Sequence, residues 1–410
     1  MFLGEIMRLL LTLLLSALAL TNASAQQAKR YIIGFKTQTA SADRAAAVAR
    51  LGGQEIDALD ELGAVIAEVP ANAKVQALSD DEMAGLSISF IEEDFYINWL
   101  KGVEPSFQSV TLPNWGQISA AIPGVAAKAL PENPLPVGVD AAEVPWGIRR
   151  VNAPNAWAKT QGEGVRVAVI DTGIDGAHPD LAGQVAGGYN AIDKNASYFD
   201  DNSHGTHVSG TIAGKWDGKG VVGVAPKARL YAVKVLDKDG GGHLTAIIKG
   251  LVWCAQNNIQ VANMSLGAPM GSVFMRLAVN YAASKGVTLV AAAGNSGGSV
   301  GYPGAYPAAI AISASDSQDH IAKFSSRGKE VAFIAPGVGV RSTVPNGGYD
   351  TYNGTSMATP HMTGLAALAV ARGAHGPDAV RAALKRAASS IGLSKTEEGY
   401  GLVDAAKLVQ

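Results

Sequence analysis

The chain has 410 residues, 48% of them hydrophobic and 17% charged, and its 48 glycines favour a large, tightly packed core with many tight turns. The formal net charge of −2 gives no reason to expect a nucleic acid or an anionic membrane surface as a partner. The single cysteine, Cys254, excludes an intrachain disulfide, and we expect it to be a buried thiol in a helix of the core.

Residues 1–25 have the pattern of a secretory signal peptide. Arg8 precedes an apolar run from Leu9 to Leu20, which is too short to span a membrane as a stable helix, and Ala23-Ser24-Ala25 supplies a small-residue cleavage site. We therefore expect a mature protein that is secreted, to the extracellular space or the periplasm, and that has no membrane partner once the signal is removed. An anchor that is never cleaved is the alternative.

Residues 26–100 predict a small α+β domain. The expected strands cover 31–35, 64–69 and 87–94, and the expected helices cover 41–50, with Ser41 as its cap, and 72–84. Residues 101–143 follow with six prolines and no sustained periodicity, so they predict an extended linker or surface arm.

Residues 144–410 alternate between strand and helix patterns. Strands are expected at 230–235, 261–266 and 288–292, and helices at 244–257 and through Ala282. This alternation predicts an α/β domain in which helices cover both faces of a parallel sheet.

Three polar side chains stand where such a fold gathers catalytic groups. Asp171 ends an apolar strand pattern, and ligands collect at the carboxyl ends of parallel strands. His204 lies among small residues before a helix, and Ser356 heads another helix, where its backbone N–H is unpaired. Taken singly, Asp171 would be interpreted as a turn residue, His204 as a surface histidine or, with His207, as half of a metal site, and Ser356 as a helix cap.

Taken together, the stretches around these residues resemble the subtilisin-like serine proteases. The runs 167–175, 202–210 and 353–361 follow the family's order, and the run 290–295 is similar to the family's strand that ends in an oxyanion-hole asparagine. The resemblance implies a subtilisin-like parallel sheet flanked by helices over 144–410. It also implies a serine endopeptidase that acts on protein and peptide substrates.

The resemblance carries roles for individual residues. It implies that Ser356 is the nucleophile, that His204 is the general base and that Asp171 orients the histidine. Asn295 is then an oxyanion donor, together with the Ser356 backbone N–H. A non-catalytic secreted binding protein on the same fold and an esterase are the alternatives. The esterase run Gly-x-Ser-x-Gly is absent, since Ala358 stands where its second glycine belongs.

Residues 26–100 are similar to the inhibitory pro-domain of the same family, a ferredoxin-like α+β fold, most specifically at 31–36 and 91–94. The resemblance implies a self-processing zymogen whose pro-domain is an intramolecular inhibitor and folding aid. Counting onward from the acidic triplet that ends at Asp94, by the family's spacing, puts the first cut between Leu100 and Lys101. A single cut close to Val144 is the alternative.

The family's substrate binds as an added strand between two backbone segments. The resemblance assigns these segments, and the two walls and floor of a primary pocket, to small residues. We therefore expect an open slot for large apolar or aromatic side chains, filled in the precursor by Leu100, and a second apolar pocket that takes Ile97. The assigned residues are Gly240, Gly241 and Gly242 for one segment, Ser265, Leu266 and Gly267 for the other segment and first wall, Ala292, Ala293 and Gly294 for the second wall, Gly301 for the floor, and Leu244, Ile247 and Leu266 for the second pocket.

The resemblance also implies a calcium site and no organic cofactor. Asp180 and Asp217 fall where the family places oxygen ligands for Ca²⁺. Two features depart from the family: Lys215 and Lys219 add positive charge to the loop, and Ala142 takes the place of a glutamine ligand. Solvated loop acids are the alternative.

Overall fold

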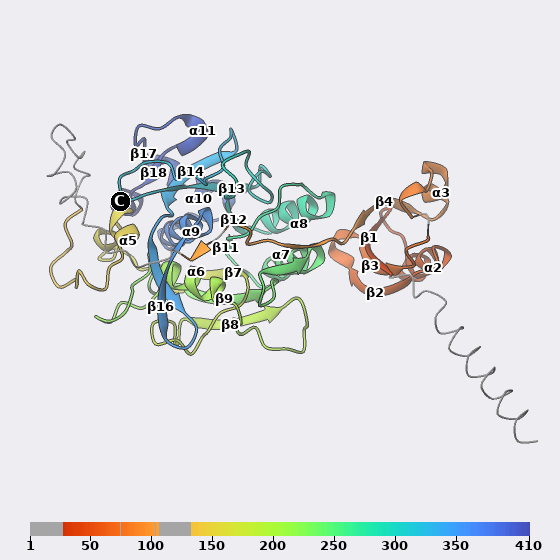
Figure 1. The fold of residues 1–410 in the computed structure, drawn as a ribbon, viewed down its shortest axis with the longest axis horizontal. Helices are drawn as coiled ribbons and strands as arrows, with labels where there is room; N and C mark the ends of the chain where they lie inside the picture. Colours follow the sequence, from red (N-terminus) through yellow and green to blue (C-terminus); the bar gives the residue numbers. More distant parts are fainter. Residues whose placement is uncertain (1–27, 74, 103, 106–132) are drawn as a thin grey trace, which may run out of the picture. The chain divides into compact units, whose positions relative to one another are not determined.

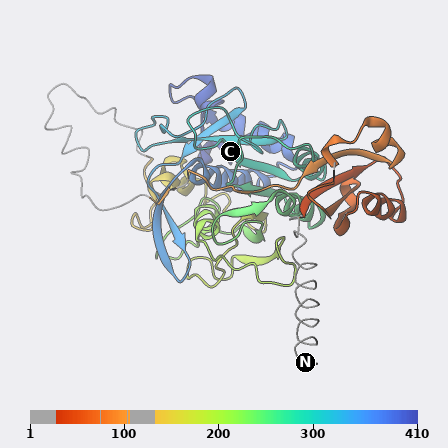
Figure 2. The ribbon, with the colours of Figure 1, turned by 45° about the vertical axis from the view of Figure 1, so that its right-hand side comes forward.

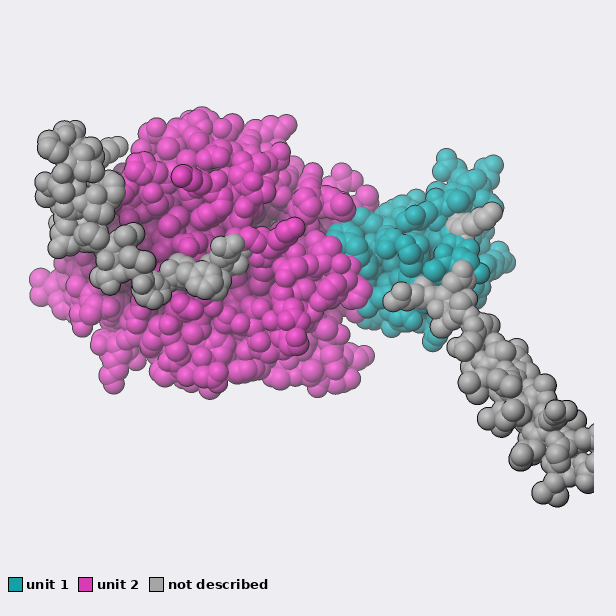
Figure 3. Space-filling model, viewed as in Figure 1, with its two compact units in different colours: residues 1–95 teal, residues 96–410 magenta. Residues whose placement is uncertain are grey.

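The computed structural model describes residues 28–73, 75–102, 104–105 and 133–410, so the predicted signal peptide lies outside the described residues. The chain forms two compact units, residues 1–95 and 96–410 (Figure 3). Within the described residues, no helix combines the length and apolar character that a membrane span requires.

The first unit is an antiparallel sheet of four strands in the order β2-β3-β1-β4, with helices α2 and α3 (Figure 1). Its core joins inward residues of β1 and β3 to Ala47 and Val48 of α2. The elements are β1 (Lys29–Phe35), α2 (Ser41–Arg50), β2 (Gln54–Leu59), η1 (Asp60–Leu62), β3 (Ala64–Val69), η2 (Val75–Ala77), α3 (Asp80–Gly85) and β4 (Ile88–Glu93).

The predicted α+β character of this unit is confirmed, but two helix details were wrong. Ala40, not Ser41, is the N-cap of α2, and it offers no side-chain bond. The helix expected over 72–84 is interrupted, because Ser79 adopts an extended conformation and starts α3 with a capping box to Glu82. The strand β2 was missed, since most of its residues are exposed and lack an apolar alternation.

The second unit is built on a nine-stranded sheet in the order β17-β18-β14-β13-β12-β11-β7-β9-β8. All neighbouring pairs are parallel except β17 with β18. The strands of this sheet are β7 (Arg166–Asp171), β8 (Val185–Asn190), β9 (Arg229–Lys234), β11 (Val261–Met264), β12 (Thr288–Ala292), β13 (Ala309–Ser315), β14 (Val331–Pro336), β17 (Ala388–Ser389) and β18 (Leu402–Val403).

The remaining elements of this unit are mostly helices. They are β5 (Tyr96–Asn98), β6 (Glu104–Pro105), α5 (Trp146–Arg150), η3 (Ala153–Asn155), α6 (His204–Ala213), β10 (Gly241–His243), α7 (Leu244–Gln256), α8 (Val273–Ser284), β15 (Val340–Val344), β16 (Gly348–Asn353), α9 (Thr355–Ala371), α10 (Pro377–Ala387), α11 (Lys395–Glu398) and α12 (Ala405–Leu408). Figure 2 shows β15 and β16 as a blue hairpin at one side of the sheet.

Helices cover both faces of the sheet, as predicted. Val167 and Val169 of β7 lie in one cluster with the apolar residues of α6 and α9. Ile170 instead faces Gly250 of α7. Because successive strand residues point to opposite faces, α7 lies on the other face from α6 and α9. Cys254 of α7 is buried, as expected, and burial raises the pKa of its thiol.

Both described ends of the predicted linker or arm contact the rest of the second unit. Glu104 and Pro105 form β6, which pairs antiparallel with Asn353 and Tyr352 at the end of β16. Near the other end of the linker, the Asn133 side-chain amide donates to the Arg149 carbonyl at 3.1 Å, and the side chains of Leu135 and Val139 pack against the core. Residues 106–132 lie outside the described part of the chain.

Candidate active site

Asp171 and His204 form a buried hydrogen-bonded pair. Asp171 is the last residue of β7, and its Oδ1 lies 2.7 Å from His204 Nδ1. The two residues are 0% and 2% exposed. A carboxylate at this distance fixes the imidazole tautomer that keeps Nε2 free to accept a proton. Nε2 is buried and has no hydrogen-bond partner among the described residues.

The start of α6 is brought against the end of β7 by a close backbone approach. A Cβ at Gly205 would collide with the carbonyl of Gly173, so glycine permits the contact that places His204 beside Asp171. Ser203, the residue before the histidine, has a φ of 114°, which is strained for a non-glycine residue. Its hydroxyl lies 2.8 Å from the Tyr352 hydroxyl, which helps to hold this conformation.

Asp200 ties the residue after Asp171 to the first turn of α6. Its Oδ1 accepts from the Thr172 hydroxyl at 2.8 Å and the Ser203 N–H at 3.0 Å. Its Oδ2 accepts from the Thr206 N–H at 2.8 Å and the Thr206 hydroxyl at 2.6 Å. Asp200 is therefore a positioning residue for the Asp171–His204 pair.

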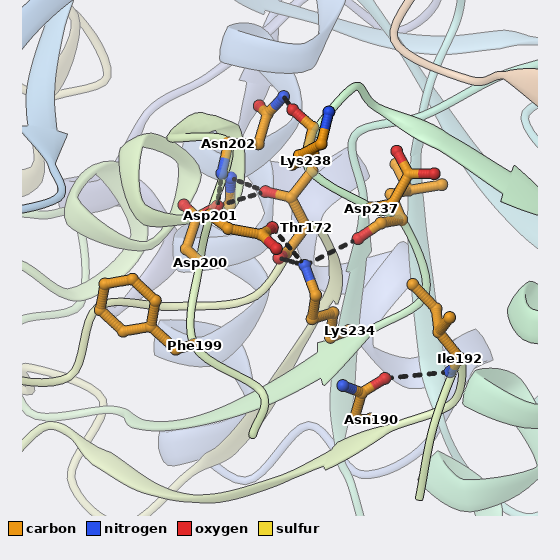
Figure 4. A network of polar contacts seen from close by, with 12 residues as sticks. Thr172, Asn190, Ile192, Phe199, Asp200, Asp201, Asn202, Lys234, Asp237 and Lys238 are labelled. Carbon is orange, nitrogen blue, oxygen red and sulfur yellow. Dashed lines mark hydrogen bonds and ion pairs between the residues drawn. The ribbon is translucent and has the colours of Figure 1, made fainter. Parts of the chain in front are cut away.

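A buried lysine on the neighbouring strand β9 also holds the residues that follow β7. Lys234, at the end of β9, donates from Nζ to the Thr172 carbonyl at 2.6 Å, to Asp201 Oδ1 at 2.7 Å and to the Leu236 carbonyl at 3.0 Å (Figure 4). The ammonium group thus joins the segments that follow β7 and β9. Sequence reasoning missed Asp200 and Lys234, although a lysine inside an otherwise apolar strand run was a usable signal.

Ser356 is the second residue of α9 and is 3% exposed. Its hydroxyl donates to the Ser265 carbonyl at 3.0 Å, and the Ser265 hydroxyl in turn donates to the Ser356 carbonyl at 2.7 Å. The structure therefore shows Ser356 Oγ turned to Ser265 and not hydrogen-bonded to His204. Catalytic hydrogen bonds of this kind commonly form only when substrate is bound.

Asn295 is held beside the head of α9. Its Oδ1 accepts from the Thr355 N–H at 2.8 Å and from the Thr355 hydroxyl at 2.9 Å. Since a backbone N–H can only donate, these bonds assign Oδ1 and leave Nδ2 as a donor without a hydrogen-bond partner among the described residues. Nδ2 lies on the side of Gly354, two residues before Ser356. The two expected oxyanion donors are thus at one helix end.

His207 has no metal-ligand geometry. Its Nε2 lies 3.0 Å from the Val340 carbonyl, and its ring stacks on Tyr352 with centroids 4.3 Å apart. Burial lowers the pKa of His207 to about 3. Within the described residues, no group of three or more His, Cys, Asp or Glu side chains converges as a metal site.

Residues 96–102, which we call the tail, occupy the expected path of the substrate in the second unit. β5 pairs antiparallel with β10, with Asn98 opposite Gly241 and Ile97 opposite Gly242. Trp99 bonds to both expected backbone segments: its N–H donates to the Gly240 carbonyl at 2.9 Å, and the Gly267 N–H donates to its carbonyl at 3.0 Å. The two glycine-containing segments therefore sandwich an added strand.

The pocket residues lie close to these segments. The Gly301 N–H donates to the Ala293 carbonyl at 2.9 Å, and the missing Cβ of Gly301 would face the Ala268 carbonyl, so Gly301 lies between the two predicted walls. The other predicted apolar pocket residues, Leu244, Ile247 and Leu266, are all buried, as are Ala292 and Ala293. Gly294 donates to the Thr355 hydroxyl at 3.1 Å.

The placement of Leu100 in the primary pocket stays a prediction, and the uncut chain is not extended through the expected cut. Residues 99–102 form a turn, with Gly102 at a φ of 84°, and the Leu100 side chain lies against Gly240. Trp99 is the buried side chain of the tail, and its indole N–H donates to the Gly242 carbonyl at 2.8 Å. Gly102 then passes over Asn295. In this turn the Leu100 N–H donates to the Asn98 side-chain oxygen at 2.9 Å.

The predicted calcium ligands come from two segments that contact each other, and they do not form a closed cluster within the described residues. Asp180 is buried, its Oδ2 accepts from the Val221 N–H at 2.8 Å, and it also bonds to the Tyr349 hydroxyl. Asp217 is exposed. Glu143, which sequence reasoning did not select, reaches the same loop: its Oε1 accepts from the N–H groups of Asp217 and Gly218 at 2.9 and 3.0 Å. Its Oε2 is buried and unpaired among the described residues.

Comparison with known proteins identifies the family of this chain. A model of the subtilase family matches residues 162–402. Subtilisin E of Bacillus subtilis strain 168 is 39% identical over 375 residues, which cover 88% of this chain and 86% of that protein. An alkaline protease of Alkalihalobacillus alcalophilus is 40% identical over 390 residues, covering 94% and 93%. A subtilisin of Bacillus pumilus is 47% identical over 272 residues, covering 64% of this chain and 98% of that protein.

Proposed function

The chain belongs to the subtilase family of serine endopeptidases, and from that premise we propose that Asp171, His204 and Ser356 hydrolyse peptide bonds as a catalytic triad. The observation that carries the proposal is the buried 2.7 Å pair of Asp171 with His204, whose Nε2 has no hydrogen-bond partner in the described part of the chain. An imidazole held in this way has one free basic nitrogen and a carboxylate that stabilises its protonated form.

In the proposed reaction, Ser356 Oγ leaves the Ser265 carbonyl and gives its proton to His204 Nε2 as it attacks the substrate carbonyl carbon. The new oxyanion takes hydrogen bonds from Asn295 Nδ2 and the Ser356 N–H. His204 then passes the proton to the leaving amine, which releases the first product. Water, deprotonated by the same nitrogen, attacks the acyl-enzyme and frees Ser356.

We propose that substrates bind as the tail residues do, as a strand between 240–242 and 265–267. The walls at 292–294 and the floor at Gly301 carry no side chain larger than a methyl group. A pocket with such a lining accepts large apolar or aromatic side chains before the scissile bond. The burial of Trp99, which is 2% exposed and donates from its indole to the Gly242 carbonyl, supports a cleft that takes large aromatic groups.

We also propose that the chain is a secreted zymogen, with a signal peptide over 1–25 and an inhibitory pro-domain over 26–100. The tail's position between the substrate-binding segments supports self-inhibition, and the 272-residue match to the Bacillus pumilus subtilisin supports a mature form of about the length of 144–410. The first cut stays predicted at Leu100–Lys101. Since this bond lies in a turn, cutting requires residues 99–102 to extend.

Calcium binding is proposed for the loop at 215–221. Asp180 and Asp217 would supply carboxylate oxygens, and Glu143 Oε2, next to the position of the glutamine that this chain lacks, is buried and has no hydrogen-bond partner among the described residues. These carboxylates do not converge in the described structure, so backbone oxygens would complete the site. Burial raises the pKa of Glu143, although the N–H groups of Asp217 and Gly218 that donate to Oε1 offset part of this effect. A bound Ca²⁺ would neutralise these groups and tie the loop to the start of the 144–410 region.

The test of the triad is secretion of the full chain with Ser356→Ala, beside the exposed control Ser284→Ala. We expect the first variant to accumulate as an uncut chain that does not hydrolyse casein, and the control to be cut and active. N-terminal sequencing of the control's earliest product should find Lys101. Casein hydrolysis by the Ser356→Ala variant would refute the assignment of the nucleophile.

A further inference from the structure

A second set of contacts holds the tail just before the segment that the cleft encloses. Tyr96 is the tail residue opposite His243 in the pairing of β5 with β10. Its backbone is part of the added strand, but its side chain makes contacts that a generic strand would not make. These contacts involve Asp237, Gly241 and His243, none of which belongs to the triad or to the primary pocket.

The phenol hydroxyl of Tyr96 donates a hydrogen bond to Asp237 Oδ2. This bond raises the pKa of Tyr96 to about 12, so the hydroxyl stays a donor. The ring meets the His243 imidazole edge to face, with centroids 5.3 Å apart and planes at 69°. An edge-to-face pair contributes favourably beyond the area that it buries.

Gly241 makes room for the ring. A Cβ at this position would collide with the hydroxyl and ring atoms of Tyr96, so the phenol crosses the strand β10 at a point where no side chain stands. The space left by the missing side chain of Gly241 therefore fits a flat ring that carries a hydroxyl donor at its end. Hydroxyl, ring and strand are each recognised by a different residue.

The acceptor is held by its own loop. Asp237 Oδ1 accepts from the Asp239 N–H at 2.9 Å and the Gly241 N–H at 3.0 Å, which leaves Oδ2 directed to the tail. The adjacent Lys238 pairs with Asp239 at 2.7 Å. Because these loop bonds need no tail residue, the carboxylate is preorganised for a ligand.

We propose that Asp237, Gly241 and His243 form a binding site for a tyrosine side chain, used by the chain's own tail and by polypeptide substrates with tyrosine opposite His243. The proposal rests on the proposed protease function and adds a specificity site to it. The ligand is a neutral phenol: phenylalanine lacks the donor, and a phosphorylated tyrosine would bring a second negative charge to Asp237.

The test uses active enzyme purified after secretion of the full chain, and two peptides with the sequence of residues 95–100, one native and one with Tyr96→Phe. Inhibition constants are measured against a chromogenic tetrapeptide substrate that ends before the tyrosine position. We expect the native peptide to inhibit about five- to tenfold more tightly, as for a hydrogen bond to a charged acceptor at a half-exposed site.

Asp237→Asn keeps an acceptor for the loop N–H groups but removes the charge, and it should reduce the ratio of the two inhibition constants to below about twofold. Asp239→Asn removes the charge of a neighbouring carboxylate that is not bonded to the phenol. It should leave the ratio of the two inhibition constants unchanged. Equal inhibition by the two peptides, or a ratio that persists in Asp237→Asn, would overturn the tyrosine site.

The chromogenic substrate separates this failure from failure of the proposed function. Hydrolysis of the tetrapeptide that is lost in Ser356→Ala reports the triad, whatever the peptides do. An enzyme that hydrolyses it but does not distinguish the peptides has the proposed triad and lacks the tyrosine site.

Discussion

Asn295 illustrates how the chemistry depends on the orientation of one side chain. The Thr355 N–H and hydroxyl both donate to Oδ1, at 2.8 and 2.9 Å, and so hold the amide with Nδ2 free. A free amide donor that is already oriented stabilises an oxyanion without reorganising during the reaction. The hydroxyl bond gives the threonine before Ser356 a role, because a residue without a side-chain hydroxyl would keep only the backbone bond.

Replacing Asn295 with leucine should therefore reduce turnover and leave substrate binding nearly unchanged. We expect kcat to fall by about 10²–10³-fold, the range established for the corresponding donor in subtilisin, with little change in KM. Steady-state kinetics on the tetrapeptide substrate measure both constants, with the exposed Asn195→Leu as the control. A raised KM with an unchanged kcat would make Asn295 a substrate-binding residue instead.

The family resemblance selected the residues proposed to react, but not the groups that position them. Asp171 ends β7, His204 begins α6 and Ser356 is the second residue of α9, and apolar runs and small residues indicate such positions. Asp200 and Lys234 act through contacts with Thr172, Thr206 and Asp201, which are formed by chain segments that the fold brings together. Nor could a pattern reveal that Ser356 Oγ rests on Ser265.

At the scale of elements, the buried strands were the most predictable. The expected 288–292 strand coincides with β12, because a parallel strand covered on both faces is a continuous apolar run. The helix expected over 72–84 was wrong, since the Ser79–Glu82 capping box starts a new helix within that run. β6 was not foreseen, because its two residues form a strand only by pairing with β16.

Removal of calcium from the loop at 215–221 should lower the thermal stability of the protein. With Ca²⁺ bound only to the folded state, EDTA should lower Tm of the Ser356→Ala chain by about 5–10 °C. Asp217→Asn and Glu143→Gln should each remove much of that difference. The exposed Asp378→Asn, at the start of α10, should retain it. Superimposable melting curves in EDTA and in calcium would exclude the site.

At the scale of the whole molecule, buried histidines should make the fold sensitive to acid. Burial lowers the pKa of His207 to about 3 and that of His361 to about 4, from 6.5 in an exposed chain. Below pH 6.5 the unfolded chain takes up protons that the folded chain excludes. The stabilisation from each neutral histidine is therefore complete above pH 6.5 and declines as pH falls toward 4.

Each histidine should contribute about 1.4 kcal/mol per pH unit to the slope of unfolding free energy between pH 6 and 4.5. Urea unfolding of the 96–410 unit in the inactive Ser356→Ala chain measures this slope. His361→Gln should reduce the slope by about that amount, whatever it does to stability at pH 7. An unchanged slope would show that His361 is protonated in the folded state.

The assignment of Ser356 as the nucleophile of a serine endopeptidase is tested most directly by covalent labelling. Active enzyme, purified after secretion of the full chain, is treated with a fluorophosphonate and digested, and the modified residue is identified by mass spectrometry. We predict one adduct per molecule, on Ser356, formed in proportion to the loss of tetrapeptide hydrolysis and absent from the Ser356→Ala chain. An adduct on another residue that tracks the loss of activity, or full labelling with activity retained, would contradict the assignment.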